Sequence, residues 1–456
     1  MAIPLHVFRE YDIRGLVASE LTPAFAEDLG RGYARFLLDK DPGAQSVVLG
    51  RDHRTSSGGL AQAFSRGVRG HGLEVISIGV VPTPVTYFAA HVLPVDGLCM
   101  ITGSHNPPEY NGFKIGIGKS TLAGPEVQEL KKYVVSAKAG ERQAREREID
   151  IVTPYVHFVV QTLGLAERRL RVVCDAGNGT GGLVGPQLLR SLGHHVIELF
   201  CELDGTFPNH HPDPTVEENL RDLQKKVVEC GADLGIAWDG DADRVGAVDE
   251  KGKILWGDQL MILFSRDVLA QRPGSTIVSE VKCSQTLYDD IEKHGGRAIM
   301  WKAGHSLIKA KMKEEHALLA GEMSGHIFFR HRYYGFDDGI YSAARLLELV
   351  SRDGRKLSQM LDDVPRTWSS PEIRFDFPEE KKFRAVELAR ERLRKVGKTI
   401  DIDGVRVILP GGWGLVRASN TQPLLVLRYE ADSPGRLAGI KQLIESTVEQ
   451  IRKELV

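Results

Sequence analysis

Strand-like and helix-like segments alternate along most of this 456-residue chain, and this alternation limits the folds that it can adopt. The segments 46–52, 74–81 and 97–102 are β-branched or apolar, as the strands of a buried sheet are. The segments 25–38 and 59–72 have the apolar spacing of helices. The arrangement predicts an α/β unit with a largely parallel sheet.

The same pattern restarts twice. A charged stretch at 139–151, which we expect to be a solvated helix or a linker, separates the first unit from strands predicted at 169–182, 194–200 and 232–248. From residue 257 a predicted helix (257–272) precedes strands at 275–281, 297–301 and 317–329.

From about residue 370 the segments suggest an antiparallel sheet with two helices. The sequence therefore predicts three α/β units and one smaller α+β unit. We place the domain boundaries at 1–150, 151–252, 253–367 and 368–456.

Composition excludes several functional classes. The chain is 42% hydrophobic and 26% charged, as soluble globular proteins are, and its net charge of -2 gives no footprint for nucleic acid or an anionic membrane. The five cysteines are scattered and form no CxxC pair, so neither a disulfide framework nor a zinc site is expected. With no signal-peptide-like start and no membrane-length apolar run, we expect a cytoplasmic protein.

Each α/β unit carries one apolar strand that opens into a polar loop with glycine: "CMITGSHNP", "GIAWDGDADR" and "LLAGEMSGH". The last unit has a similar ending in "GLVRASNTQP". This is a weak structural repeat, with one loop per domain. Four such loops could converge on one cleft.

In the first loop, Ser104 follows the apolar run 98–101, and Pro107 and Pro108 prevent the strand from continuing. Ligands of α/β proteins bind at this end of a strand. A lone serine is more often an ordinary loop residue, so a functional role for Ser104 needs support from the other loops.

The second loop, "DGDADR", is the strongest signal in the sequence. Asp239, Asp241 and Asp243 alternate, so in a regular strand they would project from one face. Carboxylates at such short distances repel one another unless a cation neutralises them. Oxygen ligands favour a hard cation such as Mg²⁺. Arg244 follows and could hold a substrate anion. An acidic turn between strands is the alternative.

The remaining loops suit a phosphorylated sugar. "RASNTQP" offers the guanidinium of Arg417 and the neutral donors of Ser419, Asn420 and Thr421, which could clamp a phosphate or simply form a turn. In "GEMSGH", Glu322 and Ser324 could grip vicinal hydroxyls.

Other polar segments support the loops less directly. Lys302, His305 and His326 are further polar candidates, but a lone histidine is more often structural, so the interpretation of His305 and His326 depends on the neighbouring motifs. "DAGNGTGG" (175–182) is better interpreted as a tight βα turn than as a dinucleotide site. "REYDIRG" (9–15) and "GRDHRTSS" (50–57) could contact an anion or cap a helix. Taken together, the loops favour phosphoryl transfer on a sugar phosphate through a serine that carries the phosphoryl group itself.

The four loops, in this order, resemble those of the α-D-phosphohexomutases, and most closely the bacterial phosphomannomutase/phosphoglucomutase branch. The resemblance covers nearly the whole chain, from "FREYDIRG" onward. It implies three topologically related α/β domains with mixed, largely parallel sheets and a C-terminal α+β domain around a central cleft. It also implies a mutase that converts hexose 1-phosphates and 6-phosphates of mannose and glucose.

The resemblance assigns roles to individual residues. Ser104 matches the phosphoserine of the family. Asp239, Asp241 and Asp243 match the Mg²⁺ ligands, and the phosphate on Ser104 completes the implied metal site. Glucose or mannose 1,6-bisphosphate is the implied intermediate and activator. Proton transfer is implied for a set of residues without a single assignment: Arg14, His105, Lys114 and His326. Substrate contacts are implied for Tyr11, Arg14, Arg244, Lys282, His305, Glu322, Met323, Ser324, Gly325, His326, Arg417, Ala418, Ser419, Asn420 and Thr421.

Two details of the loops bear on specificity. Ala242 stands where the metal loop often has glycine, but its side chain is not a ligand. Met323 and Asn420 resemble the mannose and glucose branch, whereas glucosamine-phosphate mutases usually have glutamine and glycine there. A glucosamine-phosphate mutase and a metal-dependent phosphatase with a serine nucleophile are the alternatives that stay open. A non-catalytic sensor and an NAD-dependent enzyme fit the loops less well. We expect a monomer or weak dimer with hexose phosphate substrates.

Overall fold

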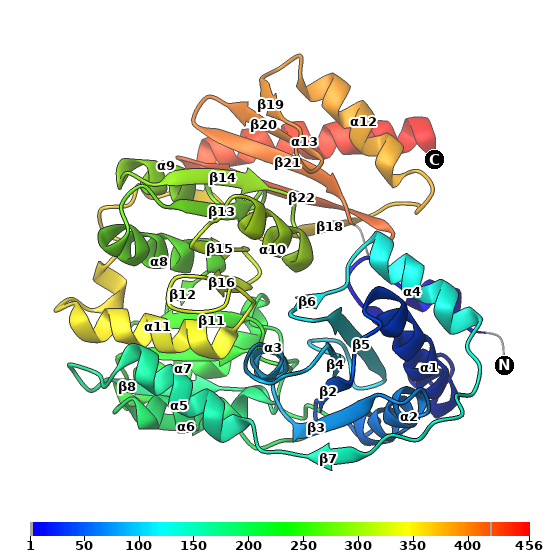
Figure 1. The fold of residues 1–456 in the computed structure, drawn as a ribbon. Helices are drawn as coiled ribbons and strands as arrows, with labels where there is room; N and C mark the ends of the chain where they lie inside the picture. The colour runs from blue at the N-terminus through cyan, green and yellow to red at the C-terminus, as the bar shows by residue number, and fades with distance from the viewer. Residues whose placement is uncertain (1–2, 420–421) are drawn as a thin grey trace.

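The first three units share one sheet plan in the computed structural model, which describes residues 3–419 and 422–456 (Figure 1). Three parallel strands lie side by side, and the third is followed by an antiparallel fourth. The equivalent sets run β3-β2-β4-β5, β9-β8-β10-β11 and β14-β13-β15-β16. The predicted fold class is confirmed.

The first unit has a seven-stranded sheet of order β1-β5-β4-β2-β3-β7, with β6 paired to β5. Its strands are β1 (Ile13–Leu16), β2 (Ser46–Arg51), β3 (Glu74–Val80), β4 (Gly97–Ile101), β5 (Tyr110–Ile117), β6 (Ser120–Thr121) and β7 (Glu146–Glu148). Its helices are η1 (Leu5–Val7), α1 (Pro23–Lys40), α2 (Ser57–Arg69), α3 (Thr83–Val92) and α4 (Pro125–Val135). The start of α1 is fixed locally, because Thr22 Oγ accepts the Phe25 N–H and Pro23 takes the first helical position.

Of the two expectations for the charged stretch 139–151, the helix is wrong. The stretch is mostly exposed chain that leads to the second unit, and Glu146–Glu148 within it forms β7, which pairs in parallel with β3 at the sheet edge. The side chains of β7 are exposed, so the strand has no apolar alternation that sequence analysis could detect.

The second unit contains β8 (Arg171–Asp175), β9 (His195–Leu199), β10 (Leu234–Trp238), β11 (Val245–Asp249) and β12 (Ile254–Leu255). Its helices are α5 (Val152–Leu163), α6 (Gly181–Ser191), η2 (Glu217–Leu220) and α7 (Arg221–Cys230). Segment 175–182 is the turn from β8 into α6, as predicted, and Gly177 and Asn178 have positive φ angles of 51° and 62° there.

The third unit contains β13 (Thr276–Glu280), β14 (Arg297–Trp301), β15 (Leu319–Gly321) and β16 (Ile327–Phe329). Its helices are α8 (Gly257–Gln271), α9 (Gln285–Lys293), α10 (His305–Glu314), α11 (Gly339–Arg352) and η3 (Leu357–Gln359). The segment 317–329 is thus two antiparallel strands joined by a loop.

The fourth unit, at the top of Figure 1, is an antiparallel sheet with two helices, as expected. It comprises β17 (Trp368–Ser369), β18 (Ile373–Asp376), α12 (Lys382–Leu393), β19 (Lys398–Ile400), β20 (Val405–Leu409), β21 (Gly412–Ala418), β22 (Leu424–Ala431) and α13 (Pro434–Leu455).

The hydrophobic core is continuous through the first three units. One cluster joins Val48 of β2 and Phe88 of α3 to residues of the second and third units. The fourth unit has its own core and meets the third through a small cluster of Val281, Trp413 and Leu415. More buried apolar surface therefore joins the first three units to one another than joins the fourth unit to the third.

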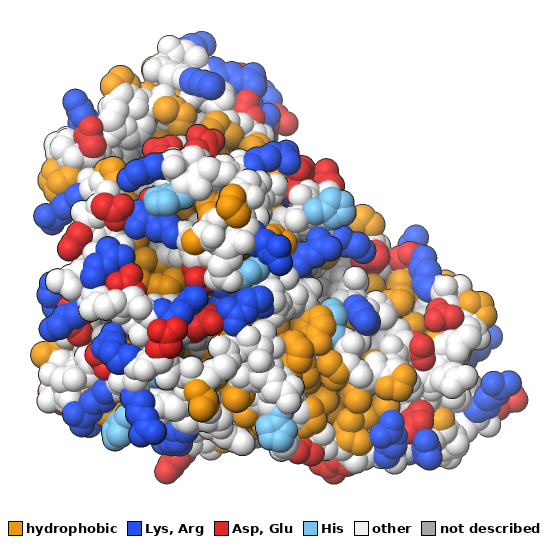
Figure 2. Space-filling model, turned by 60° about the vertical axis from the view of Figure 1, so that its left-hand side comes forward, with side chains coloured by type: hydrophobic (Ala, Val, Ile, Leu, Met, Phe, Trp, Pro, Cys, Tyr) orange, Lys and Arg blue, Asp and Glu red, His pale blue; other side chains and the backbone are white. Residues whose placement is uncertain are grey.

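The surface mixes charges of both signs. On the face drawn in Figure 2, Lys and Arg are interspersed with Asp and Glu, and the outline is hollowed between the upper part and the lobe at the lower right. Among the described residues, no helix is long and apolar enough to cross a membrane.

Candidate active site

Ser104 lies just beyond the end of β4 in a strained backbone conformation. Its φ angle of 49° is in the left-handed region, which a residue with a Cβ atom adopts at a cost of about 1–2 kcal/mol. The side chain is buried, and its Oγ donates to Asp239 Oδ2 at 2.9 Å and lies 3.1 Å from His105 Nδ1. Such strain persists at functional sites where the surroundings enforce it.

Arg54 supplies that enforcement. Its buried guanidinium donates to four carbonyl groups of the loop, those of Ser104, Asn106, Pro107 and Tyr110. Asp52 pairs with Arg54 Nε at 3.2 Å and accepts the Gly103 N–H at 3.1 Å. Sequence analysis left this segment open between anion contact and helix cap. In the structure Arg54 acts as a scaffold for the serine loop.

The three aspartates occupy the turn between β10 and β11 rather than a regular strand. Ala242, at φ 57°, allows the chain to reverse tightly there. One carboxylate oxygen from each of Asp239, Asp241 and Asp243 lies within 4.8 Å of the others, and all three residues are buried. The turn thus brings the carboxylates together, although not in the strand geometry first considered.

Lys114, from β5, provides positive charge at this turn. Its Nζ lies 2.8 Å from Asp241 Oδ2 and 2.5 Å from Asp243 Oδ2. Burial raises the pKa of both carboxyls, but the lysine outweighs it, and their pKa values lie below the usual range. Burial, with the charges of the other two aspartates, raises the pKa of Asp239.

The turn fits a metal ion. Asp241 Oδ1 and Asp243 Oδ1 are buried and have no hydrogen-bond partner among the described residues. Buried acceptors without partners are costly, and a cation would satisfy them. Because every candidate ligand is an oxygen, the site suits a hard divalent cation.

The loop between β15 and β16 lies directly against this turn. The Val245 N–H donates to the Gly325 carbonyl at 3.1 Å. Gly325 has φ 87°, and a Cβ atom there would lie 2.5 Å from the Val245 oxygen, so the approach requires glycine. Glu322 is buried and accepts the Gly304 N–H at 2.6 Å, while Met323 and Ser324 are half-buried.

Two histidines, a tyrosine and Arg244 join three units at this place. His326 stacks on His305 with ring centroids 5.5 Å apart, and Tyr11 of the first unit meets His305 edge-on at 5.4 Å. Arg244 Nε donates to His326 Nε2 at 3.0 Å. Burial, followed by the nearby Lys309 charge, lowers the pKa of His305 well below its usual value.

Arg14 and His105 complete this group of side chains. Arg14 is buried, pairs with Asp12 at 2.5 Å and donates to the Gly103 carbonyl at 3.4 Å. His105 Nδ1 lies 4.0 Å from Asp239 Oδ2, and burial lowers its pKa strongly. Both therefore flank the serine loop.

Cationic residues of the third and fourth units form a second group. Arg417 is buried and its Nε donates to Asp403 Oδ2 at 3.0 Å, and Lys282 Nζ donates to Glu372 Oε2 at 2.9 Å. The Lys282 charge lowers the pKa of Glu372 to about 2. Both cations thus already have carboxylate partners.

The rest of the predicted phosphate loop is described in part. Ala418 and Ser419 are buried, and Ser419 Oγ accepts the Gln422 N–H at 3.2 Å. Asn420 and Thr421 lie outside the described residues.

The segment before α10 connects the two groups of side chains. The Ala303 N–H donates to Asp403 of the fourth unit at 3.0 Å, and the next N–H, of Gly304, donates to Glu322. Lys302, noted in the sequence, is exposed. Side chains of all four units are therefore joined in one network.

Several residues of this network escaped sequence analysis. Asp337 is fully buried beside His326. Asp213 lies in the segment "HHPDP". Burial raises the pKa of Asp213, but the charges of His105 and Arg244 lower it to about 2. The pair Asp337–Asp338 before an apolar run predicts a helix N-cap. That signal identifies Asp338, which caps α11 through the Tyr341 N–H, and gives no role for Asp337.

Comparison with known proteins extends the likeness to the whole chain. Models described as phosphoglucomutase/phosphomannomutase match residues 5–139 (alpha/beta/alpha domain I), 153–252 (domain II), 256–368 (domain III) and 372–446 (C-terminal domain).

Individual relatives agree with these matches. A phosphomannomutase/phosphoglucomutase of Pseudomonas putida is 48% identical over 456 residues, covering 100% of this chain and 98% of that protein. One from Pseudomonas aeruginosa is 46% identical over 454 residues, 99% and 97% of the two chains. A crystal structure of a phosphoglucomutase/phosphomannomutase family protein from Burkholderia thailandensis superposes with a TM-score of 0.91, at 39% identity, over 99% of this chain and 98% of that one.

Proposed function

Because this chain belongs to the phosphoglucomutase/phosphomannomutase family of enzymes, we propose that it interconverts hexose 1-phosphates and hexose 6-phosphates of mannose and glucose. The reaction would run through a phosphoserine at Ser104 and a hexose 1,6-bisphosphate that reorients before it returns a phosphoryl group. The observation that carries the proposal is the Ser104 hydroxyl, held by a strained and supported loop 2.9 Å from the acidic turn.

Asp239, Asp241 and Asp243, together with the phosphate on Ser104, would hold Mg²⁺. The bound ion would neutralise charge on the transferring group and keep it in line. The unpartnered oxygens of Asp241 and Asp243 support this assignment.

In the first half-reaction a sugar hydroxyl attacks the phosphorus on Ser104. The new oxygen–phosphorus bond forms while the Ser104 Oγ–phosphorus bond breaks and leaves its electron pair on Oγ. The hydroxyl proton passes to a base among the residues that the resemblance implies for proton transfer. Of these, His105 Nδ1 lies 3.1 Å from Ser104 Oγ, and His326 accepts a hydrogen bond from Arg244 at its Nε2. The second half-reaction reverses these steps at the other sugar oxygen.

Lys114, His105 and Arg14 would assist around the serine. Burial lowers the pKa of Lys114, but the charges of Asp241 and Asp243 outweigh it and raise that pKa, which favours the charged ammonium form. Lys114 therefore suits charge neutralisation better than proton abstraction.

The remaining residues would bind the sugar phosphate. Glu322 and Ser324 would grip O3 and O4, which glucose and mannose present alike, so both sugars would be accepted. Contacts with the phosphate that is not reacting would come from the loop 417–421, and further contacts from Tyr11, Arg244, Lys282 and His305.

The wider setting belongs to the same proposal. The domain boundaries 1–150, 151–252, 253–367 and 368–456 are part of it, and the family ranges, of which the third ends at residue 368, support them. All five cysteines are free thiols, which suits a reducing cytoplasm. Hexose phosphates are the proposed partners, with the enzyme working as a monomer or weak dimer.

Phosphorus NMR tests the function directly. Purified protein with Mg²⁺ and a trace of glucose 1,6-bisphosphate would receive glucose 1-phosphate or mannose 1-phosphate in separate tubes. We expect both signals to give way to 6-phosphate without inorganic phosphate, and Ser104→Ala to abolish the change. Accumulation of inorganic phosphate would indicate a phosphatase and overturn the proposal.

A further inference from the structure

Asp241 of the acidic turn is held at two points by one residue of the first unit. The Thr83 hydroxyl donates to Asp241 Oδ2 at 2.5 Å, and the Thr83 N–H donates to the Asp241 carbonyl oxygen at 2.9 Å. Thr83 is the first residue of α3, is fully buried and lies 158 positions away in the chain. The start of α3 therefore packs directly on the acidic turn of the second unit.

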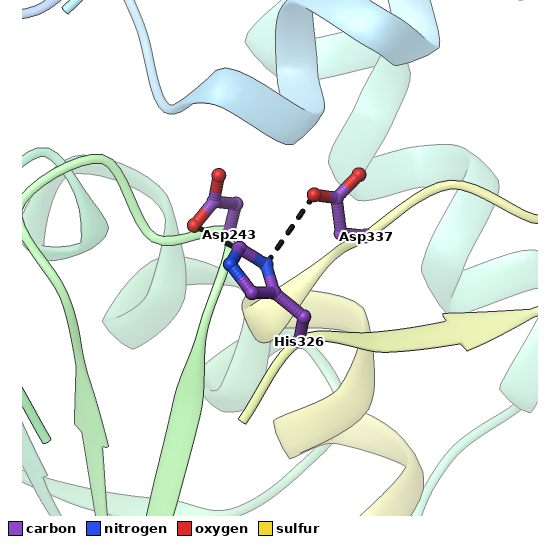
Figure 3. Close-up of side chains that lie close together, drawn as sticks. All are labelled: Asp243, His326 and Asp337. Carbon is purple, nitrogen blue, oxygen red and sulfur yellow. Dashed lines mark ion pairs between the residues drawn. The ribbon is translucent and has the colours of Figure 1, made fainter. Parts of the chain in front are cut away.

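The two oxygens of the Asp241 carboxylate have different surroundings. Oδ2 accepts from Thr83 and also from Lys114 Nζ at 2.8 Å, whereas Oδ1 is buried without a hydrogen-bond partner among the described residues. Asp243 shows the same division. Its Oδ2 accepts from Lys114, while its Oδ1 has no hydrogen-bond partner there and lies 3.7 Å from His326 Nδ1 (Figure 3). In each carboxylate, the first unit fixes one oxygen and leaves the other for a cation.

Lys114 by itself does not set the direction of the Asp241 carboxylate. Its ammonium group ends a flexible stem of four carbons and is shared between Asp241 and Asp243. Thr83 is β-branched, so its side chain is restricted, and its own N–H anchors it to the backbone of the turn. The lysine therefore supplies charge, and the threonine supplies direction.

We propose that Thr83 is a positioning residue for the metal ion, whose hydroxyl holds Asp241 Oδ2 so that Oδ1 is the oxygen left to bind the cation. The inference rests on the proposed function, because it requires the divalent cation assigned there to the acidic turn. Side chains that hydrogen-bond a ligating carboxylate from outside typically account for about 10- to 100-fold in metal affinity. A metal site built from residues of the second unit would then owe part of its affinity to a helix of the first.

A different location for the ion is the competing interpretation. Asp243, His326 and Asp337 also offer ligand atoms within 4.8 Å of one another. However, Lys309 Nζ lies 3.1 Å from Asp337 Oδ1, so that carboxylate already has a cationic partner. An ion held by this group would not depend on Thr83, whose hydroxyl bonds to a residue outside it.

Thr83→Val tests the role of the hydroxyl, because valine keeps the shape of the side chain. Asp241 Oδ2 would retain Lys114, and the backbone hydrogen bond from position 83 would remain, so the contact between the units should survive. Thr86→Val is the matched control, since Thr86 is buried one turn later in α3 and its hydroxyl donates to Met100 Sδ. Thr83→Ser restores the hydroxyl without the methyl group.

Mn²⁺ is the probe, because it accepts the octahedral oxygen ligands of Mg²⁺ and can be followed by electron paramagnetic resonance. The proteins are compared at equal phosphorylation of Ser104, checked by intact mass. We expect Thr83→Val to raise the Mn²⁺ Kd about 10- to 100-fold, and Thr83→Ser and Thr86→Val to change it by less than about threefold. The Mg²⁺ concentration for half-maximal mutase rate should rise by the same factor in Thr83→Val, with a smaller change in kcat at saturating Mg²⁺.

The outcomes separate this inference from the function on which it rests, because Mn²⁺ binding needs no substrate. Equal Kd values for Thr83→Val and the wild-type protein overturn the inference even if mutase activity is present. An equal loss of affinity in Thr86→Val, or in Thr83→Ser, also overturns it, because the effect would then come from packing of α3. The expected Kd values in a protein without mutase activity would instead overturn the proposed function.

Discussion

Replacing Lys114 by methionine should destabilise the metal-free protein strongly. The Lys114 ammonium lies 2.8 Å from Asp241 and 2.5 Å from Asp243, and all three residues are at least 95% buried, with exposures of 5%, 0% and 1%. Methionine fills similar space but carries no charge. Two carboxylates would then face each other in the interior with Asp239 beside them.

The size of the effect follows from this burial. Removing one partner of a buried ion pair costs about 3–5 kcal/mol. At about 2–4 °C per kcal/mol for a unit of 150–250 residues, the apparent Tm should fall by roughly 10 °C.

The pH dependence of stability that comes from this acidic turn should also invert. The wild-type protein has lowered pKa values at Asp241 and Asp243, so it loses stability as the pH falls through them. In Lys114→Met, burial and repulsion raise the pKa of a carboxyl group, so the folded protein takes up a proton and becomes more stable as the pH falls through that pKa. The stability difference between the variant and the wild type therefore narrows at low pH.

The assay is thermal unfolding in EDTA and in Mg²⁺, with Lys119→Met as the control, because Lys119 is exposed on the turn after the same strand. The control should change stability by less than about 0.5 kcal/mol. Mg²⁺ at 100 times its Kd stabilises by about 2.7 kcal/mol, and the Lys114→Met protein should gain more than the wild type. Equal Tm values for Lys114→Met and wild type in EDTA would refute the reasoning.

Three further substitutions test other parts of the structure. Arg54→Met removes the hydrogen bonds to four carbonyls of the Ser104 loop, so kcat should fall about 10²-fold with Tm less affected, and steady-state kinetics showing full activity would contradict the scaffold role. Gly325→Ala, with φ 87° and a Cβ 2.5 Å from the Val245 oxygen, should cost about 1–3 kcal/mol in thermal unfolding, whereas Gly59→Ala on the exposed face of α2 should not destabilise. Burial raises the pKa of Asp338 from 3.8 to about 6, so its folded form holds the proton more tightly and stability declines as the pH rises from about 4 to 6. Asp338→Asn should abolish this component, about 3 kcal/mol, in denaturant titrations at the two pH values, and parallel curves for both proteins would argue against it.

The sequence could reveal the units because their strands are buried and their helices are amphipathic, both of which leave a periodic pattern. Strand β7 left none. Its side chains are exposed, and it is held by backbone pairing to β3 and by ion pairs from Arg145 and Arg147 to Glu74. An edge strand of this kind depends on a neighbour about 70 residues away, which no local window contains.

The site shows the same division. Residues that carry the proposed chemistry lie in short motifs, so the sequence could suggest them, whereas the residues that support them are distant. Arg54 acts on Ser104 across 50 positions, and Asp337 reaches His326 only because β16 and the segment before α11 lie together. Ala242 shows another limit: its side chain is not a ligand, but its φ of 57° explains why glycine is common there.

The repeated sheet plan explains how four motifs far apart in the chain can serve one reaction. In each α/β unit the polar loop joins the third parallel strand to the antiparallel fourth, so Ser104, the three aspartates and Glu322 occupy equivalent places at the carboxyl end of β4, β10 and β15. A single rule of α/β sheets, that ligands bind at these ends, then applies three times. The contacts Ser104–Asp239 between units one and two, Arg244–His326 between two and three, and Ala303–Asp403 between three and four bring those ends together. No one unit holds the serine, the acidic turn, the histidine pair and the arginine proposed to bind phosphate, so the proposed chemistry requires all four.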